Sequence, residues 1–402
     1  MNESSGTRQA EGRERVRRIQ QALKDAQIDA VFATLPSYVL MLTGYWPVIG
    51  TAVAIATADG EVAVLAPEDE LHFAEHSWAT RIRTFKPAKL DEISTAAITV
   101  GPPLRQLLHD LNAHCARIGY EMGAASEPST YAGMNLYAQT VISMLRDAAP
   151  SAPLAPDDHL IRRLAAVKTP EEVARIRLSC QIAGLAFDNG RSQIRDSAME
   201  TGVAALYRSG FSIYGMIHEG VKRADGFAWC MSGPNSVLAK GAFAHSTSRK
   251  MQTGDFVLVH ANSYADGYWT DITRTQVLGE SAAKQRKIFA AIAEAREAAF
   301  AHIKPGAHAS EVDHAAREVI IKHGFGDNFP HSTGHGVGFN AISANARPRI
   351  HPASNEVLET GMTFNIEPAV YLSGYGGARH CDMVAVTETG MELLTDFQPL
   401  TP

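Results

Sequence analysis

The stretch from residue 255 to residue 279 reads DFVLVHANSYADGYWTDITRTQVLG and is the most informative segment of the C-terminal half of this chain. Two runs of alternating apolar residues flank Asp266-Gly267, a dipeptide typical of tight β-hairpin turns. The stretch therefore predicts a hairpin whose arms carry His260 and Asp271 at matched places. Acids and imidazoles on apolar strands are costly to bury unless they are paired or bound to a metal. We expect these two side chains to belong to one polar site.

Three later segments carry polar side chains on similar apolar runs. These segments are HSTGHGVGF (331–339), FNIEPAVYL (364–372) and GARHCDMVAV (377–386). Helical patterns surround them, and the first begins at TPEE (169–172), where Thr169 is a suitable N-cap and Pro170 a suitable first helical residue. Strands that carry such groups between helices predict an α+β domain in which an antiparallel sheet, covered by helices, holds a shared site.

The N-terminal half has a different pattern. Strand-like and helix-like segments alternate from residue 13 to about 157, including a hairpin with its turn at Asp59-Gly60. This alternation predicts an α/β domain with a partly parallel sheet. Residues 1–12 are polar and predict a disordered N-terminus. The Pro- and Ala-rich stretch DAAPSAPLAPDD (147–158) predicts a boundary, so the expected domains are 13–157 and 158–402.

Bulk composition excludes several classes of function. The net charge of −6 gives no general attraction to nucleic acid or to an anionic membrane surface. No apolar stretch is long enough to cross a bilayer, and the charged N-terminus is not followed by the apolar run of a secretory signal. The 4 cysteines are scattered, which does not predict a disulfide framework. We expect a soluble cytoplasmic protein with neither a nucleic-acid nor a membrane partner.

These motifs together resemble the pita-bread superfamily, which contains creatinases, prolidases, aminopeptidases P and methionine aminopeptidases. The stretch RIQQALKDAQIDAVFATLPSYVLMLTGY (18–45) resembles the opening of the creatinase-type N-terminal domain, and VKTPEEVARIR (167–177) resembles the start of the catalytic domain. SGPNS, GYWTDITRT, HSTGHGVGF, NIEPAVYL and GARHCD follow in the family's order. The resemblance implies a C-terminal pita-bread catalytic domain preceded by a smaller creatinase-type α/β domain.

The resemblance also implies a ligand set, because the family's metallopeptidases hold two divalent cations with two Asp, one His and two Glu. Here the second Asp, the His and the first Glu are retained as Asp271, His335 and Glu367. The first Asp position is His260, and the position of the bridging Glu is Cys381. Since two carboxylates balance only one dication, we expect at most one metal, held by Asp271, His335 and Glu367. Zinc, iron or cobalt is favoured over manganese, and metal-free operation stays open.

Several other residues are candidates with open alternatives. His331 matches a family His four residues before the ligand, whereas the peptidases' substrate-binding His is replaced by Ile342. The segment AHSTSRKMQTGD (244–255) resembles the creatinase segment that carries an acid–base His, and this makes His245 a candidate for that role. If the two segments are aligned from the hairpin without a gap, Phe243 takes that position instead. His260, Glu367 and Cys381 are further catalytic candidates, and Cys381 is equally interpretable as ligand, nucleophile or inert filler. Arg379 and Tyr371 are candidate substrate-binding residues. The alternative for Arg379 is an ion pair with Asp271 or Glu367, and the alternative for Tyr371 is core packing.

The leading hypothesis is a hydrolase of the creatinase/Xaa-Pro peptidase type that cleaves a C–N bond in a small molecule or short peptide. The alternatives are an Xaa-Pro aminopeptidase or dipeptidase with a remodelled site, a lyase of a small metabolite, and a non-catalytic binding protein. A homodimer is expected by the resemblance alone.

Overall fold

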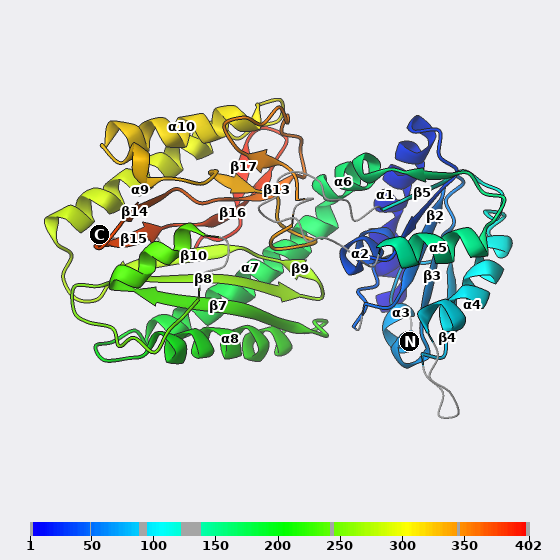
Figure 1. The fold of residues 1–402 in the computed structure, drawn as a ribbon, viewed down its shortest axis with the longest axis horizontal. Coiled ribbons are helices and arrows are strands. Elements are labelled where there is room, and N and C mark those ends of the chain that lie inside the picture. Colours follow the sequence, from blue (N-terminus) through cyan, green and yellow to red (C-terminus); the bar gives the residue numbers. More distant parts are fainter. Residues whose placement is uncertain are drawn as a thin grey trace. The chain divides into compact units, whose positions relative to one another are not determined.

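The computed structural model describes residues 3–48, 50–87, 95–121, 138–241, 245–343 and 346–398 (Figure 1). The chain divides into two compact units, Met1–Ala165 and Ala166–Pro402. The Pro- and Ala-rich stretch places the boundary near residue 157, and the packing places it after Ala165, because helix α6 (Asp158–Ala166) is held to unit 1. Arg15 Nη1 donates a hydrogen bond of 2.7 Å to the carbonyl of Leu164.

Unit 1 is built on a six-stranded sheet in the order β4-β3-β2-β1-β5-β6. The β1–β2 and β2–β3 pairs are antiparallel, and the β3–β4, β1–β5 and β5–β6 pairs are parallel, so the predicted partly parallel sheet is confirmed. The strands are β1 (Ala30–Ala33), β2 (Val53–Thr57), β3 (Val62–Pro67), β4 (Arg81–Phe85), β5 (Ile118–Tyr120) and β6 (Leu154–Pro156).

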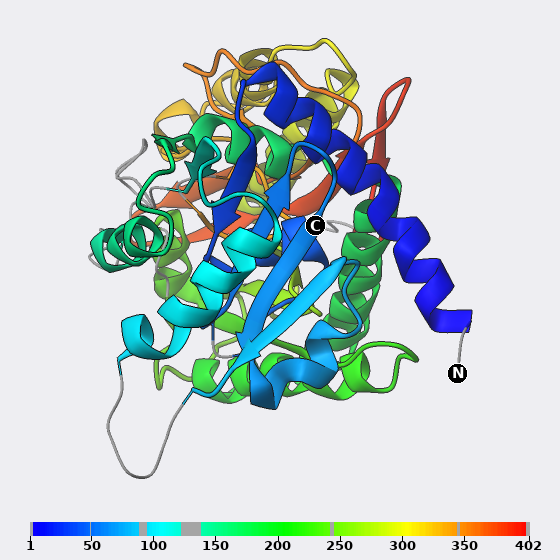
Figure 2. The same ribbon diagram turned by 90° about the vertical axis from the view of Figure 1, so that its right-hand side faces the viewer.

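Both faces of this sheet are covered, because every residue of the central strands β1 and β2 is buried. On one face, alternate residues such as Phe32, Ile55 and Leu65 pack with Leu104 and Leu145 of two helices. Figure 2 faces this unit, with the long α1 in dark blue and α4 in cyan. Its helices are α1 (Glu3–Asp25), α2 (Pro36–Thr43), α3 (Leu71–Ala74), α4 (Ala96–Asp110), α5 (Ala138–Ala148) and α6.

Helix α1 continues back to Glu3, through a stretch for which the composition predicts disorder. Its later part is anchored by Ile19 and Leu23, which are buried one turn apart, and by Glu14, whose carboxylate binds Arg18 Nε at 2.7 Å. Once such a nucleus exists, each added residue gains one backbone hydrogen bond, so a helix can extend beyond its packed part.

Unit 2 places a strongly twisted set of strands between two pairs of helices (Figure 1). Helix α7 begins as predicted: Thr169 Oγ1 accepts from the Glu172 amide at 3.3 Å, and Glu172 Oε2 accepts from the Thr169 amide at 2.8 Å. Helices α7 and α8 lie along the hairpin strands, and α9 and α10 lie on the opposite side of the unit. These helices are α7 (Pro170–Arg191), α8 (Glu200–Met216), α9 (Ala283–Ala301) and α10 (Ala309–Lys322).

The predicted hairpin is confirmed as β8 and β10, which pair antiparallel, but the predicted match of His260 with Asp271 is wrong because Thr273 stands opposite His260. Asp266 (φ 49°) and Gly267 (φ 85°) both adopt the left-handed conformation that a type I′ turn requires. Strand β7 pairs with the other edge of β8. The remaining strands form small sheets: β11–β12, β13–β16–β17 and β14–β15. Their bounds are β7 (Ala224–Ser232), β8 (Phe256–Ala265), β9 (Tyr268–Trp269), β10 (Ile272–Val277), β11 (Gly334–His335), β12 (Arg349–Ile350), β13 (Thr363–Ile366), β14 (Ala369–Leu372), β15 (Gly376–Arg379), β16 (Asp382–Val386) and β17 (Met391–Leu393).

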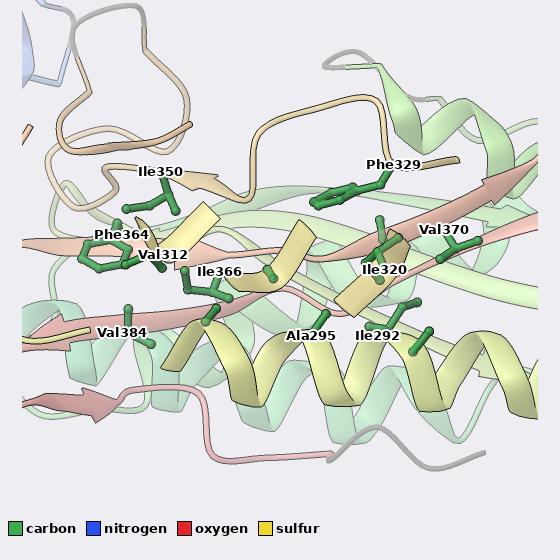
Figure 3. Packing of buried hydrophobic residues seen from close by; sticks show 14 of the residues in the cluster. Ile292, Ala295, Val312, Ile320, Phe329, Ile350, Phe364, Ile366, Val370 and Val384 are labelled. Atoms are coloured by element: carbon green, nitrogen blue, oxygen red, sulfur yellow. The ribbon is translucent and has the colours of Figure 1, made fainter. Parts of the chain in front are cut away.

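The core of unit 2 lies between α9, α10 and the C-terminal strands. Figure 3 shows Ile292 and Ala295 of α9 and Ile320 of α10 packed with Phe364 and Val370 of the strands. This apolar layer packs against β13, β14 and β16, the strands beside which Glu367 and Cys381 lie. No helix in the described part of the chain has the length and apolar character needed to span a membrane.

Candidate functional site

Backbone pairing brings the predicted polar segments together. Thr273 in β10 exchanges two hydrogen bonds with Cys381, at 3.3 and 3.1 Å, just before β16 begins. Gly336 forms a bridge with Phe364, and the Glu367 amide donates to the carbonyl of Thr333 at 2.8 Å. The hairpin, the glycine-rich segment and the last strands therefore meet at one place, as the sequence predicts.

Asp271 lies at the centre of a buried cluster. Its Oδ2 is 3.4 Å from His335 Nε2, and its Oδ1 is 3.5 Å from His260 Nδ1. The His260 ring is oriented by Thr273, whose hydroxyl oxygen is 3.0 Å from His260 Nδ1. The His335 ring is oriented by the carbonyl of Gly336, which accepts from His335 Nδ1 at 3.1 Å. Asp271 is 1% exposed, so its charge depends on these partners.

The two imidazoles differ in their tendency to carry charge. Burial, together with the positive charge of Arg379, lowers the pKa of His260 to about 3, so its ring is neutral. Burial also opposes charge on His335, but Asp271 and Glu367 outweigh that effect and raise its pKa. Burial alone would raise the pKa of Asp271, but the two imidazoles outweigh this effect and lower the pKa to about 2. Both shifts favour the charged forms of Asp271 and His335, which face each other across 3.4 Å.

Glu367 is the second carboxyl of the site, and its partner is an arginine. Burial raises its pKa to about 7, although Arg379 acts in the opposite direction. Arg379 Nη1 is 3.4 Å from Glu367 Oε2 and 3.2 Å from the carbonyl of Ala239, and its Nε donates to Thr273 Oγ1 at 3.0 Å. Of the two readings that the sequence left open for this arginine, these contacts favour the internal ion pair over the substrate clamp.

Cys381 is fully buried and faces Asp271. Its Sγ donates to the Asp271 carbonyl at 3.2 Å and lies 3.7 Å from Oδ1. Burial and the nearby carboxylates of Asp271 and Glu367 raise the pKa of this thiol well above its usual value. The group is therefore a neutral thiol, which favours a hydrogen-bond donor over a thiolate ligand or nucleophile.

Asn365 and Thr273 belong to the site and were missed by the sequence analysis. Asn365 Oδ1 accepts from the His335 amide at 2.7 Å, and its Nδ2 lies 3.4 Å from His335 Nε2 and 3.5 Å from Cys381 Sγ. One available signal was spacing, because Asn365 stands two residues before Glu367 and shares its strand face. Thr273 likewise stands two residues after Asp271.

His331 and Tyr371 form a neighbouring pair. The Tyr371 hydroxyl lies 3.1 Å from His331 Nε2 and 3.2 Å from the carbonyl of Ala239. Burial and Arg379 lower the pKa of His331 to about 4, so its ring is neutral. Because Ala239 also accepts from Arg379, this pair is continuous with the cluster.

His245 is placed differently from the other candidates. Its side chain is exposed, whereas the residues around Asp271 are buried. Among the contacts of the described residues, none joins it to the cluster. The proposed acid–base role for His245 has no support from this arrangement, and the alternative Phe243 lies outside the described residues.

The side chains do not fit a metal in this arrangement. Within the described ranges, no group of three or more His, Cys, Asp and Glu is disposed to hold a metal ion. Glu367, the third expected ligand, is paired with Arg379 instead. The guanidinium of Arg379 already supplies a positive charge beside Glu367, and the raised pKa of His335 favours a second one beside Asp271.

Comparison with known proteins supports the two-domain architecture and places the chain in a family. Residues 15–163 match the Creatinase/Prolidase N-terminal domain, and residues 174–388 match Metallopeptidase family M24. The Xaa-Pro dipeptidase of Pyrococcus furiosus is 30% identical over 384 residues, which cover 95% of this chain and 98% of that protein. An Xaa-Pro dipeptidase of Lactobacillus helveticus is 34% identical over 253 residues, 62% of this chain and 66% of that protein.

Solved structures give the same result. The prolidase of Pyrococcus horikoshii OT3 superposes with a TM-score of 0.75 at 26% identity, covering 96% of this chain and 100% of that one. The prolidase from Pyrococcus furiosus gives 0.73 at 29% identity, covering 94% and 99%. Dependence on divalent metal is general in this metallopeptidase family. The chain therefore belongs to metallopeptidase family M24, and it is a hydrolase of the creatinase/Xaa-Pro peptidase type that cleaves C–N bonds.

Proposed function

We propose that this protein hydrolyses an amide bond in a dipeptide or a similarly small molecule with its own acid–base groups. The observation that supports this proposal is that Glu367, whose pKa is about 7, lies in the same buried cluster as the Asp271–His335 pair. Two titratable groups whose environments favour opposite protonation states are suited to act as base and acid in one site.

In the proposed reaction, the Glu367 carboxylate takes a proton from water while the water oxygen bonds to the carbonyl carbon of the substrate. Collapse of the tetrahedral intermediate breaks the C–N bond, and the His335 imidazolium gives its Nε2 proton to the leaving nitrogen. Asp271 stays ionised and stabilises the imidazolium. A proton then moves from Glu367 to His335, directly or through solvent, and restores both groups.

The other residues have supporting roles in this proposal. Arg379 holds Glu367 in place and opposes its protonation, which keeps part of the population ionised near neutral pH. Asn365 and Cys381 fix His335 and Asp271 by hydrogen bonds. None of these steps is routed through a metal.

The substrate class rests on the relatives, which are named Xaa-Pro dipeptidases. Ile342 replaces the substrate-binding His expected in the family's peptidases, so we propose a preference for small amides or dipeptides other than the usual Xaa-Pro substrates. We also propose a cytoplasmic homodimer by the family resemblance. Light scattering after size exclusion tests the dimer.

The central experiment measures hydrolysis of a dipeptide and small-amide panel by protein dialysed against a chelator, with metal content determined by elemental analysis. We expect activity to persist without stoichiometric metal, and Glu367→Gln to lower kcat by about 100-fold or more, as loss of a general base does. Glu392→Gln is the matched control, because Glu392 pairs with Arg177 on the half-exposed surface.

Two results would overturn the proposal. One is a stoichiometric metal that is lost in Asp271→Ala together with all activity. The other is a folded wild-type protein that hydrolyses nothing in the panel.

A further inference from the structure

A row of aromatic rings leads from the protein surface to the buried cluster. Trp229 in β7 lies directly opposite His260 in β8, and their rings stack with centroids 5.4 Å apart at an interplanar angle of 13°. Phe227, two residues earlier, stacks on Trp229 at 6.2 Å and 19°. We call Phe227 and Trp229 the aromatic strip.

The strip belongs to the strand face on which the site lies. Side chains alternate along a strand, so Phe227 lies on the same face of β7 as Trp229, the residue opposite His260. The alternate residues Ala228 and Cys230 are fully buried on the other face, where a side chain at Gly226 would meet Phe211 of α8. Helix α8 therefore covers the opposite face of β7.

Phe227 is 52% exposed, although it adjoins a buried polar site. Trp229 is partly buried, and His260 at the inner end is 5% exposed. Exposure thus falls along the row toward the cluster. An exposed phenyl ring at the outer end of a stacked row presents an apolar surface that is continuous with the acid–base groups.

We propose that the aromatic strip is a subsite that binds an uncharged aromatic ring of the substrate next to the scissile C–N bond. This inference deepens the proposed function and rests on it. A planar ring gains from offset stacking on the strip as well as from burial.

Charges at both ends of the strip favour a neutral ring. At the inner end, His260 Nδ1 lies 3.5 Å from Asp271 Oδ1 and shares the Thr273 hydroxyl with Arg379 Nε, so a charged substrate group of either sign would meet a like charge there. At the outer end, the exposed Asp225 stands two residues before Phe227 on the same strand face and disfavours an anionic group.

A second aromatic pair lies on the same face of the neighbouring strand. Tyr264, four residues after His260, packs on Trp269 with ring centroids 4.7 Å apart. The Trp269 amide donates to the carbonyl of Gly338 at 2.6 Å, which ties this pair to the glycine-rich segment that carries His335. The hairpin thus extends the aromatic surface along the site.

The experiment compares wild type with Phe227→Leu and Trp229→Leu on matched dipeptides that carry phenylalanine or leucine on either side of the bond. We expect the preference for phenylalanine over leucine to fall by about 3- to 10-fold, through KM with little change in kcat, since the stacking contribution beyond burial is of that size. Trp229→Phe should restore most of the preference. The control is Tyr214→Leu on α8, which covers the opposite face of β7.

A binding measurement separates this inference from the proposed catalysis. The probes are 3-phenylpropan-1-ol and 4-methylpentan-1-ol, which are neutral and have no amide, and their affinities are measured by ligand-observed NMR titration. We expect wild type to bind the phenyl alcohol about 3- to 10-fold more tightly and Phe227→Leu to lose the difference.

The outcomes are distinguishable. If wild type hydrolyses no amide but shows a Phe227-dependent preference for the phenyl alcohol, catalysis fails and the subsite stands. Equal binding of the two alcohols by wild type overturns the subsite. An equal loss of kcat on phenylalanine and leucine substrates in both variants also overturns it, because the strip would then only support His260.

Discussion

Replacement of Asp382 by asparagine should destabilise the protein strongly, because this carboxylate is the fully buried centre of an ion network. Its Oδ1 accepts from Arg274 Nη2 at 2.8 Å and from Thr395 Oγ1 at 2.7 Å. Its Oδ2 accepts from Arg296 Nε at 2.5 Å, and His380 Nε2 lies 3.2 Å away. The network joins β16 to β10, to α9 and to the last residues of the chain.

The expected cost follows from what the substitution leaves behind. Arg274 is 7% exposed, and asparagine would leave its guanidinium bound only to neutral carbonyls such as those of Cys381 and Thr395. Removing one partner of a buried ion pair typically costs about 3–5 kcal/mol. For a unit of this size, each kcal/mol lowers the melting temperature by about 2–4 °C, so we expect a fall of roughly 10 °C.

The pH dependence has a definite sign. Burial alone would raise the pKa of Asp382, but Arg274, His380 and Arg296 outweigh it and hold the pKa well below its ordinary value of 3.8. A depressed pKa gives stabilisation that is present above pH 3.8 and is lost as the pH falls through the folded-state value. The difference between wild type and Asp382→Asn should therefore be full at pH 7.

The assay is chemical denaturation at pH 7, with Glu392→Gln as the control. Glu392 binds Arg177 at 2.7 Å, but the two side chains are 38% and 36% exposed, so their pair is worth about 0–1 kcal/mol. The prediction is wrong if the unfolding free energy of Asp382→Asn lies within about 1 kcal/mol of that of this control.

Three further expectations concern the site and the hairpin. The pKa of Glu367 in the folded protein is about 7 and exceeds its ordinary value of 4.5, so the contribution of this group to stability is present below pH 4.5 and is lost as the pH rises through 7. Glu367→Gln should therefore flatten the decline of the unfolding free energy between pH 5 and 7. An unchanged slope would contradict this assignment. The double variant His260→Asp, Cys381→Glu would complete the five-residue ligand set that the family resemblance implies, and isothermal titration with Mn²⁺ or Co²⁺ should show binding that neither single variant matches. Gly267→Val places a β-branched residue at φ 85° and should cost about 1–2 kcal/mol in the same denaturation assay, whereas a neutral result would argue against the type I′ turn.

The sequence was sufficient wherever structure depends on neighbouring residues. The turn at Asp266-Gly267 and the cap formed by Thr169 and Glu172 follow from backbone conformations and hydrogen bonds that a few adjacent residues determine. The polar residues on apolar runs also predicted a shared site that contains Asp271 and Glu367. The family's ordered motifs then brought Asp271, His335, Glu367 and Cys381 to one region, and the backbone pairing of their strands agrees.

Which of these groups contact each other became clear from the folded structure alone. Arg379 is paired with Glu367 and not free for a substrate carboxylate, and Asn365 links His335 to Cys381. His245, by contrast, stands exposed. Such distances depend on how strands separated by many residues pair and twist, and hence on burial, which sets the pKa of each group. Local sequence carries no measure of either quantity, because both arise from contacts between segments far apart in the chain.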